Sequence, residues 1–187
     1  RGQLLHGELS DSQVTRLFDL CKLWGAMKYA HPDAMKGDID VDMELAKILP
    51  AIINTDNEDS VRVLLREWCR PGNIPETGNS VAPAWAYSNT SAYIKDLMNS
   101  FWSADFTRES HYIRLEINSV PNFQNERRYE DIPFPSQPLQ LLSLFRFWNA
   151  VQYYYPNIGS IPNWDDVLEE YIPIFMNAEP KQEYVSS

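Results

Sequence analysis

LFDLCKLWGAMKYAHP (residues 17–32) occurs a second time, in altered form, as LLSLFRFWNAVQYYYP (residues 141–156). When the two stretches are aligned without a gap, six positions are identical: Leu17/Leu141, Leu20/Leu144, Trp24/Trp148, Ala26/Ala150, Tyr29/Tyr153 and Pro32/Pro156. Chance would give about one match in a window of this length, so a repeated structural unit is the better interpretation. The shared aromatic residues then belong to a scaffold and not to a catalytic centre.

The spacing of apolar residues in both stretches predicts a helix. In the first stretch, Ser10 and Gln13 form a capping box that starts the helix, and Pro32 ends it, because the residue before a proline disfavours helix. The second helix is expected over about residues 136–155.

A second helix follows each stretch, and each of these helices contains a proline. Asp40 is the expected cap of a helix that contains Pro50, and Asn163 is the expected cap of a helix that contains Pro173. Each proline should kink or split its helix. After an adjustment of one residue, Pro173 corresponds to Pro50, so the sequence predicts two related helical hairpins.

The region between the hairpins has a less regular pattern. Thr55 and Glu58 predict a capping box for a third helix, and residues 91–102 read as a shorter helix. Residues 70–83 are rich in proline and glycine, which is typical of a loop.

Residues 111–118 alternate between apolar and polar side chains, which predicts a strand. Its partner is expected near residues 83–88 or in a part of the protein outside this sequence. Residues 121–138 are polar and interrupted by prolines.

We therefore predict a mainly α fold with two related helical hairpins, an internal duplication, and a small β element between them. The expected units are residues 1–70, 71–135 and 136–187, within one compact domain that stops short of a further domain. The chain begins with Arg1 and ends at Ser187, and both ends look cut, which suggests a fragment.

Composition excludes several function classes. The 187 residues are 44% hydrophobic and 13% aromatic, which favours a folded globule. The formal net charge is −10 and the isoelectric point is about 4.7, so the surface repels nucleic-acid phosphates and anionic lipids. No apolar run approaches the roughly 18–20 residues of a membrane span.

No residue pattern predicts a cofactor or a metal. The three histidines lack ligand spacing, and His31 is expected to be a capping or surface residue. The acidic run of Asp38, Asp40, Asp42 and Glu44 resembles a calcium loop, but the glycine and the final glutamate of such a loop are misplaced. These acids, like Asp165 and Asp166 in the second hairpin, are better explained as favourable charges at a helix N-terminus.

The two cysteines, Cys21 and Cys69, are too few for a disulfide framework and are interpreted as buried free thiols. There is no GxSxG, SxxK or glycine-rich phosphate motif, so no catalytic residue is predicted.

The aromatic residues of the second stretch are the candidate ligand contacts. Six of its side chains share one face that fits core packing: Leu141, Leu144, Phe145, Trp148, Val151 and Tyr155. Phe147 and Tyr154 lie off this face, so they are the candidates for exposed contact with a peptide or a sugar.

LCKLWGAMKYAHP and LFRFWNAVQYYYP, each followed by a helix with an internal proline (ELAKILPAI and WDDVLEEYIPIFMNA), resemble the N-terminal region of certain bacterial serine peptidases. These are the C-terminal-processing, or tail-specific, proteases, in a form common among secreted proteins of Bacteroides-like bacteria. The resemblance covers most of the chain, although Ala30 and Val41 depart from the aromatic residues that are typical of the pattern.

In that family a serine nucleophile and a lysine base lie downstream, in a domain that this chain does not contain. The resemblance therefore implies a periplasmic, cell-surface or extracellular protein and a non-catalytic module that scaffolds or gates a downstream protease domain. Its partners would be that domain and its peptide substrate. The alternative is a free-standing module that binds peptides or glycans, and a self-contained hydrolase is the least favoured interpretation.

Overall fold

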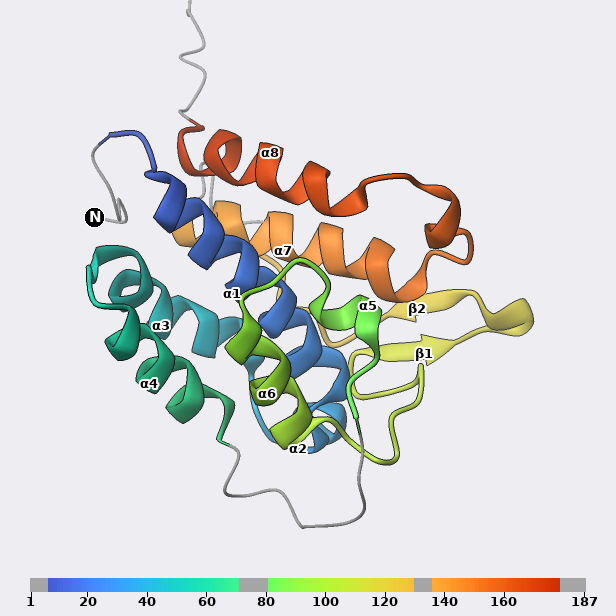
Figure 1. The fold of residues 1–187 in the computed structure, drawn as a ribbon. Helices are drawn as coiled ribbons and strands as arrows, with labels where there is room; N and C mark the ends of the chain where they lie inside the picture. The colour runs from blue at the N-terminus through green and yellow to red at the C-terminus, as the bar shows by residue number, and fades with distance from the viewer. Residues whose placement is uncertain (1–6, 71–80, 130–135, 179–187) are drawn as a thin grey trace, which may run out of the picture.

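The computed structural model describes residues 7–70, 81–129 and 136–178. Within these ranges the chain is mainly helical, with a small two-stranded antiparallel sheet (Figure 1). The elements in chain order are α1 (Asp11–Ala30), α2 (Pro32–Lys36), α3 (Val41–Asn54), α4 (Glu58–Cys69), α5 (Ala84–Tyr87), α6 (Ala92–Phe101), β1 (Ile113–Leu115), η2 (Ile117–Ser119), β2 (Pro121–Phe123), α7 (Gln137–Tyr154), η3 (Ile158–Ser160) and α8 (Trp164–Met176).

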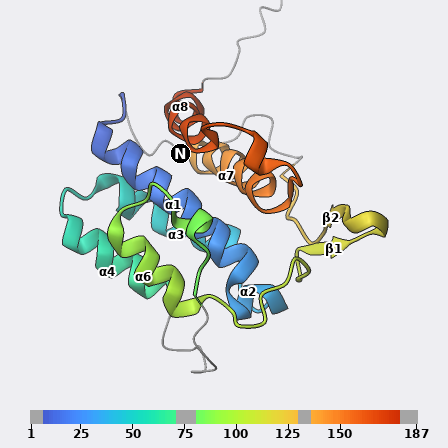
Figure 2. The same ribbon diagram turned by 45° about the vertical axis from the view of Figure 1, so that its right-hand side comes forward.

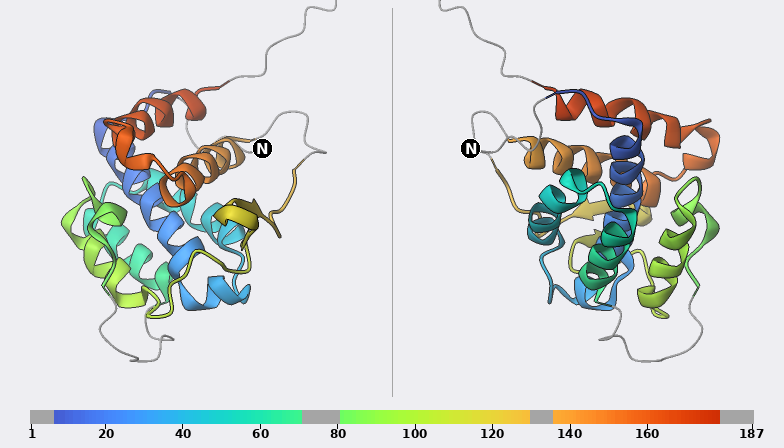
Figure 3. Two further views of the ribbon diagram at one scale, coloured as in Figure 1. Left: turned by 90° about the vertical axis from the view of Figure 1, so that its right-hand side faces the viewer. Right: turned by 60° about the vertical axis from the view of Figure 1, so that its left-hand side comes forward.

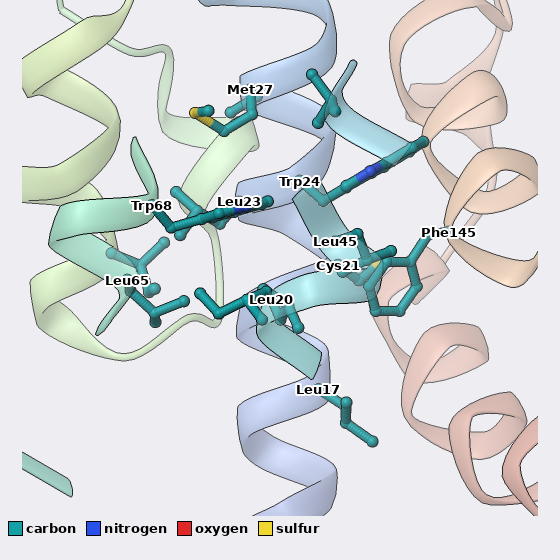
Figure 4. Close-up of a cluster of buried hydrophobic side chains, with 14 of the residues drawn as sticks. Leu17, Leu20, Cys21, Leu23, Trp24, Met27, Leu45, Leu65, Trp68 and Phe145 are labelled. Atoms are coloured by element: carbon teal, nitrogen blue, oxygen red, sulfur yellow. The ribbon is translucent and has the colours of Figure 1, made fainter. Parts of the chain in front are cut away.

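Helix α1 is the centre of the fold, and every residue from position 16 to position 30 is buried. It packs against α3, α6, α7 and α8, which surround it (Figures 2 and 3). A helix that is covered on all sides contributes side chains to several interfaces at once. Figure 4 shows this core, in which Leu20, Leu23 and Trp24 of α1 lie among side chains of the neighbouring helices.

The predicted limits of α1 are confirmed. Ser10 Oγ accepts a hydrogen bond from the Gln13 amide, and Gln13 Oε1 accepts one from the Ser10 amide, which completes the capping box. At the other end, His31 Nδ1 accepts a hydrogen bond from the Asp33 amide and so caps α2. His31 is a cap, as predicted, but it is fully buried and not a surface residue.

The second helix of each predicted hairpin also forms. Asp40 caps α3, because its side chain accepts a hydrogen bond from the Met43 amide. Pro50 lies inside α3 and Pro173 inside α8, and neither proline splits its helix. Asn163 occupies the cap position of α8, but its side chain makes no capping hydrogen bond there.

The predicted cap of the third helix was wrong. Helix α4 is capped by Asn57 and not by Thr55: the Asn57 side chain accepts from the amides of Asp59 and Ser60. Glu58, the expected partner of Thr55, instead accepts a hydrogen bond from Arg16 of α1. Most of the predicted loop over residues 70–83 lies outside the described residues.

The predicted strand is shorter than expected and has a different partner. Strand β1 pairs with β2, which follows it directly, with Ile113 opposite Phe123. Asn118 and Ser119, both with positive φ, reverse the chain between the two strands. The expected partner region near residues 83–88 contains helix α5 instead.

Helices α1 and α7 are in close contact at Gly25. A Cβ atom on Gly25 would lie 1.9 Å from Asn149 Oδ1, so any larger residue there would have to displace the Asn149 side chain. Asn149 Nδ2 donates hydrogen bonds to the backbone oxygens of Cys21 and Phe145, each at 3.0 Å. Gly25 and Asn149 occupy the same position in the sequence alignment, as do Tyr29 and Tyr153, whose ring centroids are 5.0 Å apart.

Gly25→Ala is expected to destabilise the protein by about 1–3 kcal/mol, because the added methyl group overlaps the Asn149 side chain. Urea unfolding measures the change. In an Asn149→Ala background the same substitution should cost clearly less, since the clashing atoms are gone. Gly159→Ala is the matched control, because a Cβ atom there meets nothing within 4 Å. Equal losses of stability for Gly25→Ala and Gly159→Ala would contradict a close contact between α1 and α7 at Gly25.

A second tertiary contact fixes the segment that precedes α6. Asp19 of α1 is buried, and its Oδ1 accepts a hydrogen bond from the Ser91 amide at 3.1 Å. Burial raises the pKa of Asp19 to about 6, against an ordinary value of 3.8. The folded protein therefore binds a proton at Asp19 more readily than the unfolded chain does, and this contribution to stability is lost as the pH rises through about 6.

Asp19→Asn keeps the acceptor oxygen for Ser91 and removes the buried charge. The stability of this variant relative to the parent should rise from near zero at pH 4 to about 2–3 kcal/mol at pH 8. Urea unfolding across this pH range measures the difference, with Asp59→Asn, an exposed carboxylate, as the control. A difference that does not change with pH would rule out the raised pKa.

Candidate functional site

The buried part of α1 carries two lysines, and the first of them pairs with α8. Lys22 Nζ donates to both carboxylate oxygens of Asp165, at 3.0 and 3.1 Å, and to the Ser88 carbonyl at 2.6 Å. Asn89 Nδ2 donates to Asp165 Oδ2 at 2.7 Å. The Lys22 side chain is only 1% exposed, so a buried ion pair joins α1, α8 and the loop after α5.

The second lysine pairs with α3, the other helix of its own predicted hairpin, and with the segment after β2. Lys28 Nζ lies 2.6 Å from Glu126 Oε1 and 3.6 Å from Asp42 Oδ1, and its side chain is fully buried. It also lies over the rings of Trp24 and Tyr112, at 4.9 and 4.6 Å from their centroids. The site around Lys28 is thus an enclosed ammonium site made of two carboxylates and two aromatic rings.

Arg146 of α7 reaches the same carboxylates. It pairs with Asp42, and its Nη2 lies 3.1 Å from Glu126 Oε2. In the sequence alignment Arg146 stands opposite Lys22, and Asp165 stands opposite Asp42 after the one-residue adjustment. Two ion pairs, Lys22–Asp165 and Arg146–Asp42, therefore each join the first helix of one predicted hairpin to the second helix of the other.

Burial lowers the pKa of both lysines, and the carboxylates oppose this effect. Asp165 does so at Lys22, and Asp42 and Glu126 do so at Lys28. A buried cation without such partners would be strongly destabilising, which explains why each lysine meets an acid.

A cleft of about 670 Å³ opens beside Asp165. Its aromatic wall consists of Trp85, Tyr153 and Trp164, and its polar wall includes Gln152, Asp165 and Asp166. Trp85 is 38% exposed and meets Tyr153 edge to face, with ring centroids 4.8 Å apart. We name this depression the α8 cleft.

Carboxylates and aromatic rings in one concave site suit two classes of ligand. Aromatic faces attract cations and carboxylates pair with them, while the same groups also stack on and hydrogen-bond to sugars. Ser88 also lines the cleft, and its Oγ accepts a hydrogen bond from Lys22 Nζ at 3.0 Å and donates one to Asp165 Oδ2 at 3.2 Å.

The two predicted contact residues lie together in a different depression. Phe147 and Tyr154 line an apolar groove of about 430 Å³ between α7 and the β hairpin, together with Phe123, Val151 and Tyr155. Phe147 is 61% exposed, as predicted.

Tyr154 is not exposed, however. It is 3% exposed and packs between the rings of Tyr29 and Phe123. Conversely, Tyr155 was assigned to the core face and is 45% exposed. A single helical face was a poor guide because α7 is covered on several sides.

The two cysteines lie inside the fold. Cys21 and Cys69 are free thiols and both are buried, as predicted. Burial raises the pKa of each, so neither is a nucleophile at neutral pH. The described ranges contain no group of three or more His, Cys, Asp or Glu side chains that could hold a metal ion. The acids once compared with a calcium loop include Asp42, which pairs with cations instead.

Comparisons with known protein families, with curated proteins and with solved structures find no match. In the described part of the chain, no helix has both the length and the apolar character needed to cross a membrane.

Sequence reasoning missed the residues that build the α8 cleft. Trp85 comes from a region without a periodic pattern, and Asp165 was taken for a simple helix-dipole charge. One signal was present in the alignment: Lys22 and Arg146 are both cations within otherwise apolar helices, and Asp42 and Asp165 are both acids at helix starts.

Lys22→Met is expected to destabilise the protein by about 3–5 kcal/mol, because it leaves the Asp165 carboxylate without its buried cation. Lys22→Met combined with Asp165→Asn should recover part of this loss. Lys47→Met removes an exposed ion pair with Glu44 and should change stability by less than about 1 kcal/mol. Thermal and urea unfolding of the four proteins measure these changes, and similar losses at positions 22 and 47 would contradict the buried pair.

Proposed function

We propose that this chain is the non-catalytic N-terminal module of a secreted serine peptidase of the C-terminal-processing family, and that it scaffolds or gates the downstream protease domain. The observation that carries the proposal is the pair of stretches around Trp24 and Trp148, each followed by a helix with an internal proline. As part of the proposal, the parent protein is periplasmic, cell-surface or extracellular.

The contacts of the described residues favour a scaffolding role over a catalytic role. Lys22 donates to Ser88 Oγ, but it also donates to both carboxylate oxygens of Asp165, and the Ser88 hydroxyl donates to Asp165, so the lysine is held in an ion pair and not as the free base of a serine nucleophile. The polar interactions join helices to each other. This is the pattern of a scaffold whose partner performs the reaction.

The proposal includes an internal duplication. The two predicted hairpins are taken to be α1 with α3, and α7 with α8. Three observations support it: the aligned sequences, the contact of Gly25 with its counterpart Asn149, and the contact of Tyr29 with its counterpart Tyr153. The two ion pairs are a fourth observation. Lys22 of α1 pairs with Asp165 of α8, and the residues aligned with them, Arg146 of α7 and Asp42 of α3, pair with each other. Such an arrangement is what an isologous two-fold contact between two copies would produce.

The alternative function is a free-standing peptide- or glycan-binding module. The α8 cleft favours it, because Trp85 and Asp166 are both exposed and both line the cleft. The two functions are compatible if the cleft holds part of the peptidase substrate.

The test of the main proposal is to read the coding sequence past Ser187 and to express the whole parent protein. We expect a domain with a serine nucleophile and a lysine base, and we expect removal of residues 1–187 to change folding, activity or substrate range. Casein cleavage and labelling with serine-reactive probes measure activity, and the isolated chain should show neither. A stop codon directly after Ser187, or a parent protein indifferent to the deletion, would refute the proposal and favour the binding module.

A further inference from the structure

The two halves of the molecule differ at a buried cation. In the first half, Lys28 places its ammonium beside Asp42, and the rings of Trp24 and Tyr112 cover it. In the sequence alignment, Gln152 stands opposite Lys28 and Asp165 opposite Asp42. The second half thus keeps the acid and replaces the lysine with a neutral side chain.

Gln152 and Asp165 line the α8 cleft together. In the second half the side chain aligned with Lys28 therefore lies at an open cleft, where Asn89 Nδ2 donates to Asp165 Oδ2 at 2.7 Å. A second difference points to the same place, since buried Val41 is replaced by Trp164, which presents an aromatic ring to the cleft.

The charge balance of the cleft favours a cation. Lys22 neutralises Asp165, with which it forms the buried pair. Asp166 is exposed at the rim, and its side chain has no hydrogen bond or ion pair with the other described residues. One negative charge is therefore left over beside the three aromatic rings. In the first half the charges of Asp42, Glu126, Lys28 and Arg146 cancel.

We infer that the α8 cleft binds a primary ammonium group, as on a lysine side chain or at the N-terminus of a peptide. The ammonium would pair with Asp166 and lie against Trp85 and Trp164, in the manner of Lys28 between Trp24 and Tyr112. The inference rests on the proposed duplication for the correspondence of Gln152 with Lys28. It does not require that the parent protein be a peptidase.

A neutral sugar is the competing ligand. Sugars stack on aromatic rings and accept and donate hydrogen bonds, but they gain little from an unpaired carboxylate. The surplus charge at Asp166, and the net charge of −10 on the whole chain, favour the ammonium.

The test is to titrate the complete chain with small ligands and to monitor each titration by two-dimensional NMR. The indole N–H signals of Trp85 and Trp164 are the reporters. The main probe is lysine blocked at its α-amine and carboxyl groups. Its side-chain-acetylated form has the same shape without the charge, triglycine amide offers an N-terminal amine, and cellotetraose is the neutral sugar. The blocked lysine should shift both indole signals in a saturable way, and the acetylated form should bind at least ten-fold more weakly.

The decisive variants are Gln152→Lys and Gln152→Met. The lysine restores the residue type of the first half and should occupy the cleft with its own ammonium, so binding of the blocked lysine should be lost. The methionine has a similar length and no charge, so binding should persist. Asp166→Asn should weaken binding by about three- to ten-fold, whereas Asp59→Asn, an exposed acid far along the chain, should not.

Unchanged backbone spectra show that each variant is folded. Tighter binding of triglycine amide than of the blocked lysine would keep the ammonium site and assign it to peptide N-termini. Equal binding of the charged and acetylated probes, full binding in Gln152→Lys, or binding of cellotetraose alone would overturn the inference. The absence of binding by every probe would overturn it as well, and none of these results bears on whether a protease domain follows Ser187.

Discussion

The burial of two lysine ammonium groups in one helix is the constraint on which the structure depends. Lys22 and Lys28 lie in the fully covered part of α1, where an uncompensated charge would cost more than the domain can sustain. Each lysine must therefore pair with an acid from another part of the chain. The two acids, Asp165 and Asp42, lie in the first turns of α8 and α3, where the helix dipole also favours a negative charge. The ion pairs therefore fix where α3 and α8 begin relative to α1, which hydrophobic packing alone leaves free to slide.

The contact between α1 and α7 completes this arrangement. Gly25 lets the two backbones approach, and Asn149 uses the space for hydrogen bonds to the Cys21 and Phe145 carbonyls, which are otherwise bonded only within their own helices. A larger residue at position 25 would push the helices apart and lengthen the Lys22–Asp165 and Arg146–Asp42 distances together. The close contact and the two crossed ion pairs are thus coupled, because one rigid-body shift would disturb all three.

The fold could be predicted where local interactions decide it, and only there. The capping box at Ser10, the cap at Asp40 and the periodic apolar faces each depend on residues within a few positions, and those predictions were confirmed. Asn57 replaced Thr55 as a cap because its side chain reaches two amides and because Arg16, 42 residues away, takes Glu58. The partner of β1 was missed since a positive φ at Asn118 and Ser119, which sequence does not reveal, folds the next residues back. Tyr154 was taken for an exposed residue because its cover comes from Tyr29 and Phe123, which lie far away in sequence.

The cleft lies where the two aligned sequence stretches differ. The two aligned stretches, with the helices that follow them, share a tryptophan, a tyrosine, a cation and an acid. Gln152 and Trp164, which differ from the aligned Lys28 and Val41, both line the α8 cleft. An open cleft does not contribute to the stability of the fold. A single ammonium in a partly solvated cleft would be held weakly, since exposed ion pairs contribute little. Weak binding still has a use when the ligand is one side chain of a longer peptide, because a tethered subsite raises the effective concentration of that peptide near a second site. A binding cleft on a scaffold is therefore most useful when the scaffold is attached to the domain that acts on the peptide.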